Sequence, residues 1–344
     1  MQIAIIAGSV TNITNLVTSC TWSGDIKQAA RKLEFTFVQS DMDFNIPKID
    51  IDCGYTVVAG SESGEVVFRG NIYRIERDRA KNQVKVVSYD NLFVLNRSKT
   101  TQKFTNAYPE DIARSVCSLM GVKVGTIATT GVPVSFIANG KSGRQIIQGA
   151  YTEAKKQNGK LYQLIMRSDE LDVIEKGALC GYIADAASNM TDSIYHKSTE
   201  NLVNTVMIVD EQGNGAEFIT DDESISKYSQ FIEVYKQQKD KDAQQEAKAL
   251  LTKPDLDGNV TGLGDYRCIS GYSLIVRDAN FNGQFYIEAD THEFSNGLHT
   301  MKLKLAFENL MDEVEVEHEK KKSSTSKKEK KTEDTDKTKR ERKV

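Results

Sequence analysis

The chain has 344 residues, of which 39% are hydrophobic and 27% charged, and its formal net charge is −4. This composition excludes a wholly disordered chain, because it supplies enough apolar side chains for a core. The length predicts about two domains. The sequence contains no run of about 18 apolar residues, which excludes a helical membrane span. The first ten residues have no basic segment and are not expected to be a secretory signal.

Charge is distributed unevenly along the chain. Residues 320–344 contain 12 Lys and Arg against 5 Asp and Glu, which leaves 33 basic and 44 acidic residues, a net charge of −11, in the remainder. The segment has one apolar residue, Val344, and cannot bury enough surface to offset its ordering entropy. We therefore expect residues 313–344 to form a charged, disordered tail. The acidic body is not expected to bind nucleic acid sequence-specifically.

Short alternating runs dominate residues 1–103. Residues 33–37 alternate apolar and polar side chains, residues 83–86 do the same, and glycines separate the runs between them. Alternation with a period of two is typical of half-buried strands. We expect this region to form a first antiparallel β-barrel domain.

The period changes after residue 104. Pro109 suits the first position of a helix, and Gly121 suits the left-handed position that ends one. Acidic residues follow Pro109, which favours the helix N-terminus. The sequence thus predicts an α/β domain over residues 104–180, with its first helix between these two residues.

A second helix is predicted within the same domain. Ser142 and Gln145 have the spacing of a capping box, and Gly159 would end the helix. Two strands are expected next, around residues 161–166 and 171–174, with a turn between them.

Residues 181–312 again indicate strands, and we expect a second β-barrel domain there. Strands are predicted at 201–209 and 231–235, and a short helix at 241–251. Residues 301–307 place apolar side chains on one face and lysines on the other, as in an antiparallel strand with one solvent-exposed face. The predicted fold is α+β and mostly β: two antiparallel β-barrel-like domains with an α/β unit inserted between them.

Two segments partly match nucleotide-binding motifs, but each lacks residues that its motif requires. Residues 3–9 end in Gly8 but do not continue as Gly-x-Gly-x-x-Gly, so a first strand is expected there. Gly140-Lys141-Ser142 precedes a helix, yet a phosphate loop needs Gly at position 135, where Ser135 stands. Ser142 is explained as a helix cap.

Two further segments are better explained without a ligand. Asp255-Leu256-Asp257-Gly258-Asn259 begins like a calcium loop, but Val260 and Tyr266 occupy positions that require Gly and Glu, so a polar turn is expected. Residues 73–79 mix aromatic and basic side chains with acidic ones, which favours a solvated strand over a nucleic-acid surface.

His292 and His299 flank the turn at residues 295–297. In a hairpin they would be close enough for a metal site or a general-base pair, but two partly exposed histidines on a hairpin are the more common arrangement. The five cysteines are expected to be reduced thiols, because they are scattered and form no Cys-x-x-Cys pair: Cys20, Cys53, Cys117, Cys180 and Cys268. We assign no catalytic, cofactor-binding or metal-binding residue and expect no cofactor.

Several short segments occur in one order over residues 20–310. They are Thr21-Trp22-Ser23-Gly24-Asp25, Arg31-Lys32-Leu33-Glu34-Phe35, Pro47-Lys48-Ile49-Asp50, Phe68-Arg69-Gly70, Tyr89-Asp90-Asn91-Leu92, Gly159-Lys160, Val173-Ile174-Glu175-Lys176-Gly177, Gly262-Leu263-Gly264-Asp265-Tyr266-Arg267-Cys268 and residues 290–301. In this order the chain resembles the hub proteins of contractile phage tails and phage-like bacteriocins, in particular the XkdQ/YqbQ family of defective Bacillus prophages, related to late control protein D.

The resemblance implies a trimeric baseplate hub, with two similar barrels per subunit giving pseudo-six-fold symmetry. Such a ring would join the hexameric tail tube to the trimeric central spike. The implied partners are two further copies of the chain, the tube protein, the spike protein, the wedge proteins of the baseplate and the tape measure protein. The implied location is a phage or bacteriocin particle assembled in the host cytoplasm, with no membrane contact.

Two other classes remain open from the sequence. A tail-associated cell-wall hydrolase would need an activated nucleophile, a zinc site or a separated acid pair, and would show muralytic activity. A free-standing carbohydrate- or peptide-binding module would be a monomer, which light scattering distinguishes from a ring.

Overall fold

The computed structural model describes residues 1–318 except residues 29, 41, 44, 211, 239–241 and 280–281. The part of the predicted tail that follows residue 318 lies outside the described residues. Within the described part of the chain, none of the helices combines the length and apolar character needed to cross a lipid bilayer.

The N-terminal β part is an antiparallel sheet in the spatial order β3-β4-β7-β6-β5-β1-β2. Its elements are β1 (Gln2–Ala7), β2 (Ser9–Asn12), the 3-10 helix η1 (Thr14–Leu16), β3 (Val17–Asp25), β4 (Lys32–Val38), β5 (Thr56–Gly60), β6 (Val66–Asp78) and β7 (Gln83–Tyr89). Alternate residues of β4 are buried, which confirms the predicted period of two. Leu33, Phe35 and Phe37 project from it into a core that also contains Ile3 and Val57.

The second β part has the order β14-β18-β21-β20, with β19 next to β20 and β13 next to β19. Its strands are β13 (Leu179–Asp185), β14 (Met190–Ser198), β18 (Asp255–Leu263), β19 (Ser273–Arg277), β20 (Asn282–Ser295) and β21 (Leu298–Ala306). Met301, Leu303 and Leu305 of β21 are buried, whereas Lys302 and Lys304 face solvent, as predicted.

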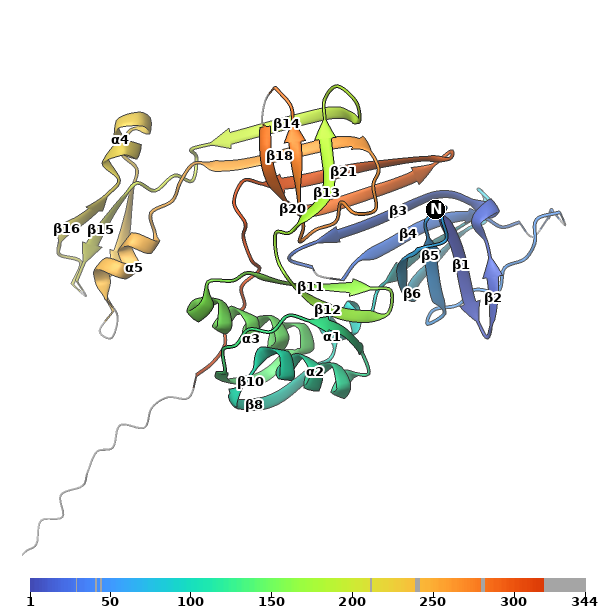
Figure 1. The fold of residues 1–344 in the computed structure, drawn as a ribbon, viewed down its shortest axis with the longest axis horizontal. Coiled ribbons are helices and arrows are strands. Elements are labelled where there is room, and N and C mark those ends of the chain that lie inside the picture. The colour runs from blue at the N-terminus through green and yellow to red at the C-terminus, as the bar shows by residue number, and fades with distance from the viewer. Residues whose placement is uncertain are drawn as a thin grey trace, which may run out of the picture.

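The two β parts are joined edge to edge into one sheet. β20 pairs antiparallel with β3, which places His292 opposite Trp22 and Phe294 opposite Cys20. Figure 1 shows the orange strands of the second part continuing into the blue strands of the first. The mostly β, α+β fold class is therefore confirmed. The pairing of β3 with β20 is a further finding that the sequence did not predict.

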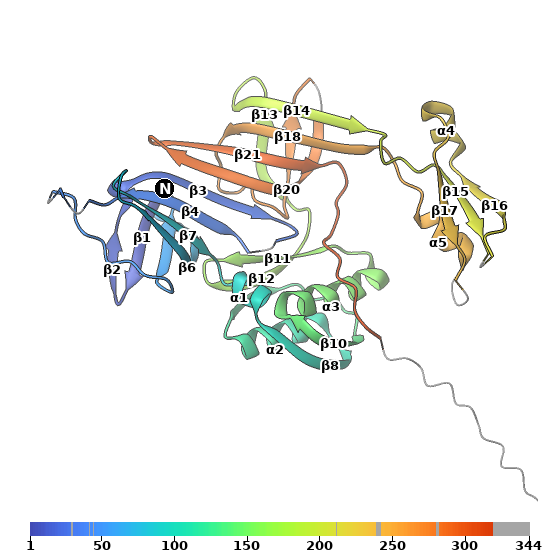
Figure 2. The same cartoon turned by 180° about the vertical axis from the view of Figure 1, so that it is seen from behind.

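The α/β unit lies against the junction of the two β parts, with β11 and β12 on the side nearest them (Figures 1 and 2). Its elements are α1 (Leu92–Arg97), β8 (Lys99–Ala107), α2 (Pro109–Met120), β9 (Lys123–Ile127), β10 (Val134–Ser142), α3 (Gly143–Asn158), β11 (Tyr162–Arg167) and β12 (Glu170–Glu175). Both predicted helices are confirmed. Gly121, with a φ of 69°, ends α2, and a capping box of Ser142 and Gln145 begins α3.

The α/β unit begins earlier in the chain than the predicted residue 104. Leu92 and Leu95 of α1 are fully buried in the core of this unit, and β8 pairs with β10. The polypeptide therefore leaves the first sheet after β7 and enters the α/β unit at α1.

A small unit stands apart from the second β part, attached by the segments that follow β14 and precede β18 (Figures 1 and 2). It contains β15 (Thr205–Val209), β16 (Gly215–Thr220), α4 (Asp222–Tyr228), β17 (Ile232–Lys236) and α5 (Ala243–Ala249). Its own core includes Val206, Ile208, Tyr235 and Ala247. The predicted strand at 201–209 and the predicted helix at 241–251 are present with shorter bounds, and the strand at 231–235 is shifted by one residue. These elements form a unit of their own within residues 181–312.

The last described segment returns to the α/β unit after β21. Arg144 pairs with Asp312, and Val314 donates its backbone N–H to Thr152 Oγ1 at 3.2 Å. Ile137 forms an isolated antiparallel bridge with Glu317. Residues 313–318, which we predicted as the start of the tail, thus contact α3 and β10.

Candidate functional site

A buried ion pair lies where the two β parts meet. Arg31, which precedes β4, and Asp290 of β20 form a bidentate contact, with Nη1 and Oδ1 3.0 Å apart. Both side chains are almost inaccessible to solvent. The backbone N–H of Ser270 also donates to Asp290 Oδ1 at 2.6 Å. Gly24 makes room for this pair, because a Cβ at that position would collide with the Arg31 guanidinium.

A second buried carboxylate, Asp90, connects the ion pair to the α/β unit. It accepts backbone N–H groups from Arg31 and Leu92, each at 3.0 Å, and so holds the start of α1 beside the sheet. Burial raises the pKa of Asp90 to about 7, although the two N–H groups and the charge of Arg31 act in the opposite direction. Three parts of the chain thus converge on the segment around Arg31.

Trp22 covers the ion pair from the sheet side. The guanidinium carbon of Arg31 lies 4.0 Å from the Trp22 ring, a cation–π arrangement, and the His292 ring lies 5.0 Å from the same indole. Trp22 is the chain's single tryptophan. Its fluorescence is therefore a local probe of the junction.

The two histidines of the β20–β21 hairpin form a hydrogen-bonded pair. His292 Nε2 is 3.0 Å from the carbonyl oxygen of Cys268, so this nitrogen carries the proton. His292 Nδ1 is then an acceptor, and it lies 3.0 Å from Nε2 of His299, which donates. In this arrangement the His292 ring is neutral. The prediction that both would be partly exposed is wrong for His292, which is fully buried.

Burial lowers the pKa of His292, and burial together with the neighbouring His292 lowers that of His299 to about 4. A histidine whose pKa is lower in the folded protein contributes stability above its unfolded pKa of about 6.5. This contribution is lost as the pH falls towards the pKa of the folded state. Asp90 has a raised pKa, so its contribution changes in the opposite direction.

We expect acidification from pH 7 to pH 4.5 to destabilise the wild type more than His299→Gln, by roughly 1–2 kcal/mol after allowance for partial solvent screening. Asp90 is present in both proteins, so its effect cancels when their free energies of unfolding are compared at each pH. Urea unfolding followed by Trp22 fluorescence at each pH measures the difference. Parallel profiles for the two proteins would contradict the prediction.

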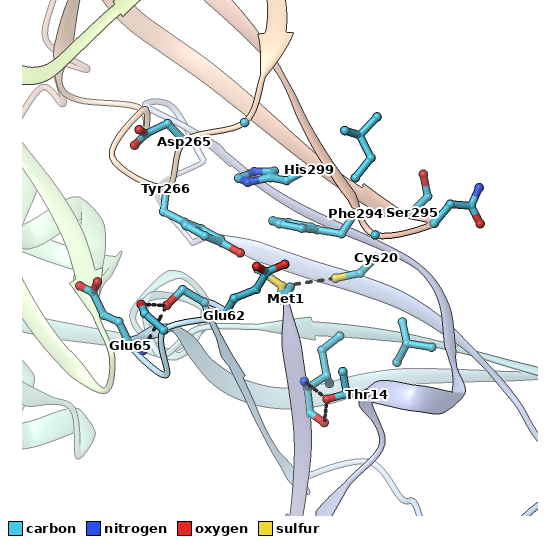
Figure 3. Close-up of a pocket in the computed structure, with 18 of the residues that line it drawn as sticks. Met1, Thr14, Cys20, Glu62, Glu65, Asp265, Tyr266, Phe294, Ser295 and His299 are labelled. Carbon is cyan, nitrogen blue, oxygen red and sulfur yellow. Dashed lines mark hydrogen bonds between the residues drawn. The ribbon is translucent and has the colours of Figure 1, made fainter. Parts of the chain in front are cut away.

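A cleft of about 650 Å³ opens beside the histidine pair (Figure 3). Aromatic rings form one wall: the ring centroids of Phe294 and His299 are 4.1 Å apart, and those of Tyr266 and His299 are 4.7 Å apart. Glu62, Glu65 and Asp265 supply carboxylates around it. Residues from both β parts line the cleft, so its shape depends on the junction.

Three reactive groups of this cleft, Cys20, Asp265 and His299, are engaged by neighbouring side chains. Burial raises the pKa of Cys20 to about 12, and its Sγ lies 3.7 Å from the Met1 sulfur, so the thiol stays protonated. Asp265 is paired with Arg267 at 2.8 Å, which lowers the pKa of that carboxyl. With His299 bonded to His292, none of these groups is poised as a nucleophile or general base.

The other sequence motifs form ordinary structural elements, and of these only β1 reaches the cleft, through Ile3. Residues 3–7 belong to β1, residues 73–78 to β6, and Ser142 caps α3, as predicted. Residues 255–259 do not form the predicted polar turn: they belong to β18 and pair with β14. Among the described residues, no group of three or more His, Cys, Asp or Glu side chains is arranged to hold a metal ion.

Sequence reasoning did not identify Arg31, Asp90 and Asp290 as one cluster. They are separated by 59 and 200 positions along the chain, and nothing local to any of them indicates burial. The available signal was the resemblance, because all three belong to the segments that carry it.

Comparison with known proteins identifies the family. The chain is 24% identical over 320 residues to XkdQ of the phage-like element PBSX of Bacillus subtilis, covering 86% of this chain and 94% of the relative. Its fold is similar to the 43 kDa tail protein of prophage MuSo2 from Shewanella oneidensis, with a TM-score of 0.67, 14% identity, and coverage of 89% and 98% of the two chains. A tail protein from Neisseria meningitidis gives a TM-score of 0.61 at 13% identity, covering 88% and 95%. A model of the YQBQ-like family matches residues 20–306, most of the chain, which confirms the resemblance: the chain belongs to the YQBQ-like family.

Proposed function

We propose that this chain is a structural protein of a phage-type tail baseplate: a hub whose three copies form a ring between a hexameric tail tube and a trimeric central spike. The name of XkdQ, from a phage-like element, and the tail-protein neighbours support a tail or baseplate role. The ring, its tube, spike, wedge and tape measure partners, and its place in a phage or bacteriocin particle form the finer part of the proposal.

The observation that carries the proposal is the fusion of two β parts into one sheet. Three subunits would present six β parts, the number needed to match a six-fold tube, while keeping the three-fold symmetry of a spike. Such a connector must keep its two β parts at a fixed distance and angle. The β3–β20 ladder and the buried Arg31–Asp290 pair serve that purpose.

The ends of the sheet support a closed ring. The spatial order of strands in the joined sheet runs from β14 at one end to β2 at the other. In the described residues, each of these two strands has one neighbouring strand in this order. Exposed edge strands pair readily with another chain. A ring needs two different contact faces on each subunit. The ends also carry exposed apolar side chains, Val10 on β2 at 70% and Ile194 on β14 at 42% exposure.

The proposed role has no catalytic step. It requires that the His292–His299 pair, the Cys20 thiol and the Asp265–Arg267 pair act in packing, as their contacts indicate. This separates the hub from a tail-associated hydrolase, which would need one of these groups, or the Glu62 and Glu65 carboxylates of the cleft, to act on a substrate.

The test is the number and place of copies in a native particle. An electron-microscopy reconstruction is expected to show three copies at one end of the tail tube, each burying more than about 1,000 Å² against the next. Six copies, or copies distributed along the tube shaft, would overturn the hub proposal and favour a wedge or tube component.

A further inference from the structure

Two cysteines far apart in the sequence lie side by side in the second β part. Cys180 is in β13, and Cys268 is in the loop between β18 and β19. Their sulfur atoms are 3.9 Å apart, and both are free thiols. We propose that Cys180 and Cys268 form a redox-active dithiol, which a small-molecule disulfide oxidises to an intramolecular disulfide. This modification site is independent of the proposed hub role.

The backbone already holds the two segments together. Parallel pairing places Leu179 of β13 opposite Ser273 of β19. Arg267 donates from Nη1 to the Gly181 carbonyl at 3.2 Å, which ties the residue before Cys268 to the residue after Cys180. A disulfide has an S–S distance of about 2.05 Å. The thiols therefore need to close by about 2 Å, a movement within reach of side-chain rotation.

The two thiols differ in the way that a disulfide exchange requires. The contact with Cys268 and the nearby charge of Arg267 lower the pKa of Cys180, against the opposing effect of burial. Cys268 is fully buried, and the contact with Cys180 together with this burial raises the pKa of Cys268. Cys180 is partly accessible and lines a second cleft, of about 400 Å³, together with Arg167 and Arg267. It is thus the attacking thiolate, and Cys268 is the resolving thiol.

The reaction balances with glutathione disulfide as the oxidant. Cys180 Sγ attacks one glutathione sulfur, the S–S bond of the oxidant breaks, and one glutathione leaves as a thiolate. Cys268 Sγ then gives up its proton and displaces the second glutathione from Cys180. Two protein thiols lose two electrons and two protons, and one glutathione disulfide becomes two glutathione thiols.

The bridge would close a long segment of chain. Cys268 follows Cys180 by 88 positions, and this interval contains β14, β18 and the whole small unit. The stabilisation expected from a disulfide increases with the length of the loop that it closes, so this loop is at the upper end of the range. Oxidation would therefore fix the base from which the small unit projects.

The test uses the full-length reduced chain. It is treated with oxidised glutathione, remaining thiols are blocked with N-ethylmaleimide, and tryptic peptides are mapped by mass spectrometry. Cleavage after Lys176, Lys197, Arg267 and Arg277 isolates peptides 177–197 and 268–277. We expect these two peptides to be joined, and the melting temperature to rise by roughly 5–10 °C and return on reduction with dithiothreitol.

Control variants separate this pair from ordinary thiol oxidation. Cys53 is exposed, and Cys53→Ser is expected to leave both the joined peptide and the thermal shift unchanged. Cys180→Ser and Cys268→Ala should each abolish them. The proposal would be overturned if peptides 177–197 and 268–277 were recovered separately, each blocked by N-ethylmaleimide, under conditions in which oxidised glutathione modifies Cys53. It would also be overturned by glutathione retained on Cys180 with no joined peptide. The peptide map of the wild type decides the question even if Cys268→Ala does not fold.

Discussion

Replacing Arg31 by alanine is expected to lower the free energy of unfolding by about 3–5 kcal/mol, the usual cost of removing one partner from a buried ion pair. The substitution leaves the Asp290 carboxylate inside the junction with the N–H of Ser270 but without its counter-charge. It also removes the cation from the face of Trp22. Chemical denaturation followed by Trp22 fluorescence measures the loss.

A matched control is available on the surface. Lys253 and Glu308 form an ion pair at 3.2 Å with side chains 84% and 64% exposed. Lys253→Ala is expected to change the stability by less than about 1 kcal/mol, because exposed pairs contribute little. If Arg31→Ala and Lys253→Ala cost the same, the junction does not depend on the buried pair, and the β3–β20 ladder alone would have to keep the connector rigid.

Gly70→Ala is expected to destabilise the first β part by roughly 3 kcal/mol, at the upper end of the cost of overpacking a core. A Cβ on Gly70 of β6 would lie 2.6 Å from the carbonyl carbon of Tyr89 and closer still to its oxygen. It would also meet the ring of Phe68 at 2.7 Å. The obstacle is mainly backbone, so β6 and β7 would have to separate. Thermal unfolding of the purified variant measures the effect.

Gly143→Ala provides the comparison for Gly70→Ala. Its new Cβ would lie 2.5 Å from Sδ of Met120, which belongs to a flexible side chain that can rotate away. We expect a change of about 1 kcal/mol or less. A larger effect at Gly143 than at Gly70 would show that the backbone contact between β6 and β7 adapts more easily than its geometry indicates.

Local signals made the helices predictable. Pro109 and Gly121 delimit α2, and the Ser142–Gln145 box begins α3, because caps depend on residues a few positions apart. The alternation in β21 was equally clear. By contrast, β18 contains Asp255, Gly258 and other residues that rarely form strands. It is extended because β14 and β21 pair with it on both sides, a tertiary effect that local reasoning misses.

The burial of His292 was not predictable for a related reason. Asp290, His292 and Phe294 alternate along β20 and all point into the junction, so the strand has the correct period but two polar residues at inward positions. Hydrophobic alternation cannot identify such a face. This face becomes buried only because Trp22 of β3 and Arg31, which precedes β4, contact it from the other end of the chain.

The β3–β20 ladder also has a consequence for synthesis. Phe294 lies 274 positions after Cys20, its partner in the ladder. At about 5–20 residues per second, the ribosome needs tens of seconds to produce β20 after β3 has emerged. During that interval one edge of β3 has no partner strand, and Arg31 has no Asp290. Unpaired strand edges invite association with other chains. We therefore expect nascent chains truncated before residue 282 to aggregate or bind chaperones, and chains that include β20 to become soluble.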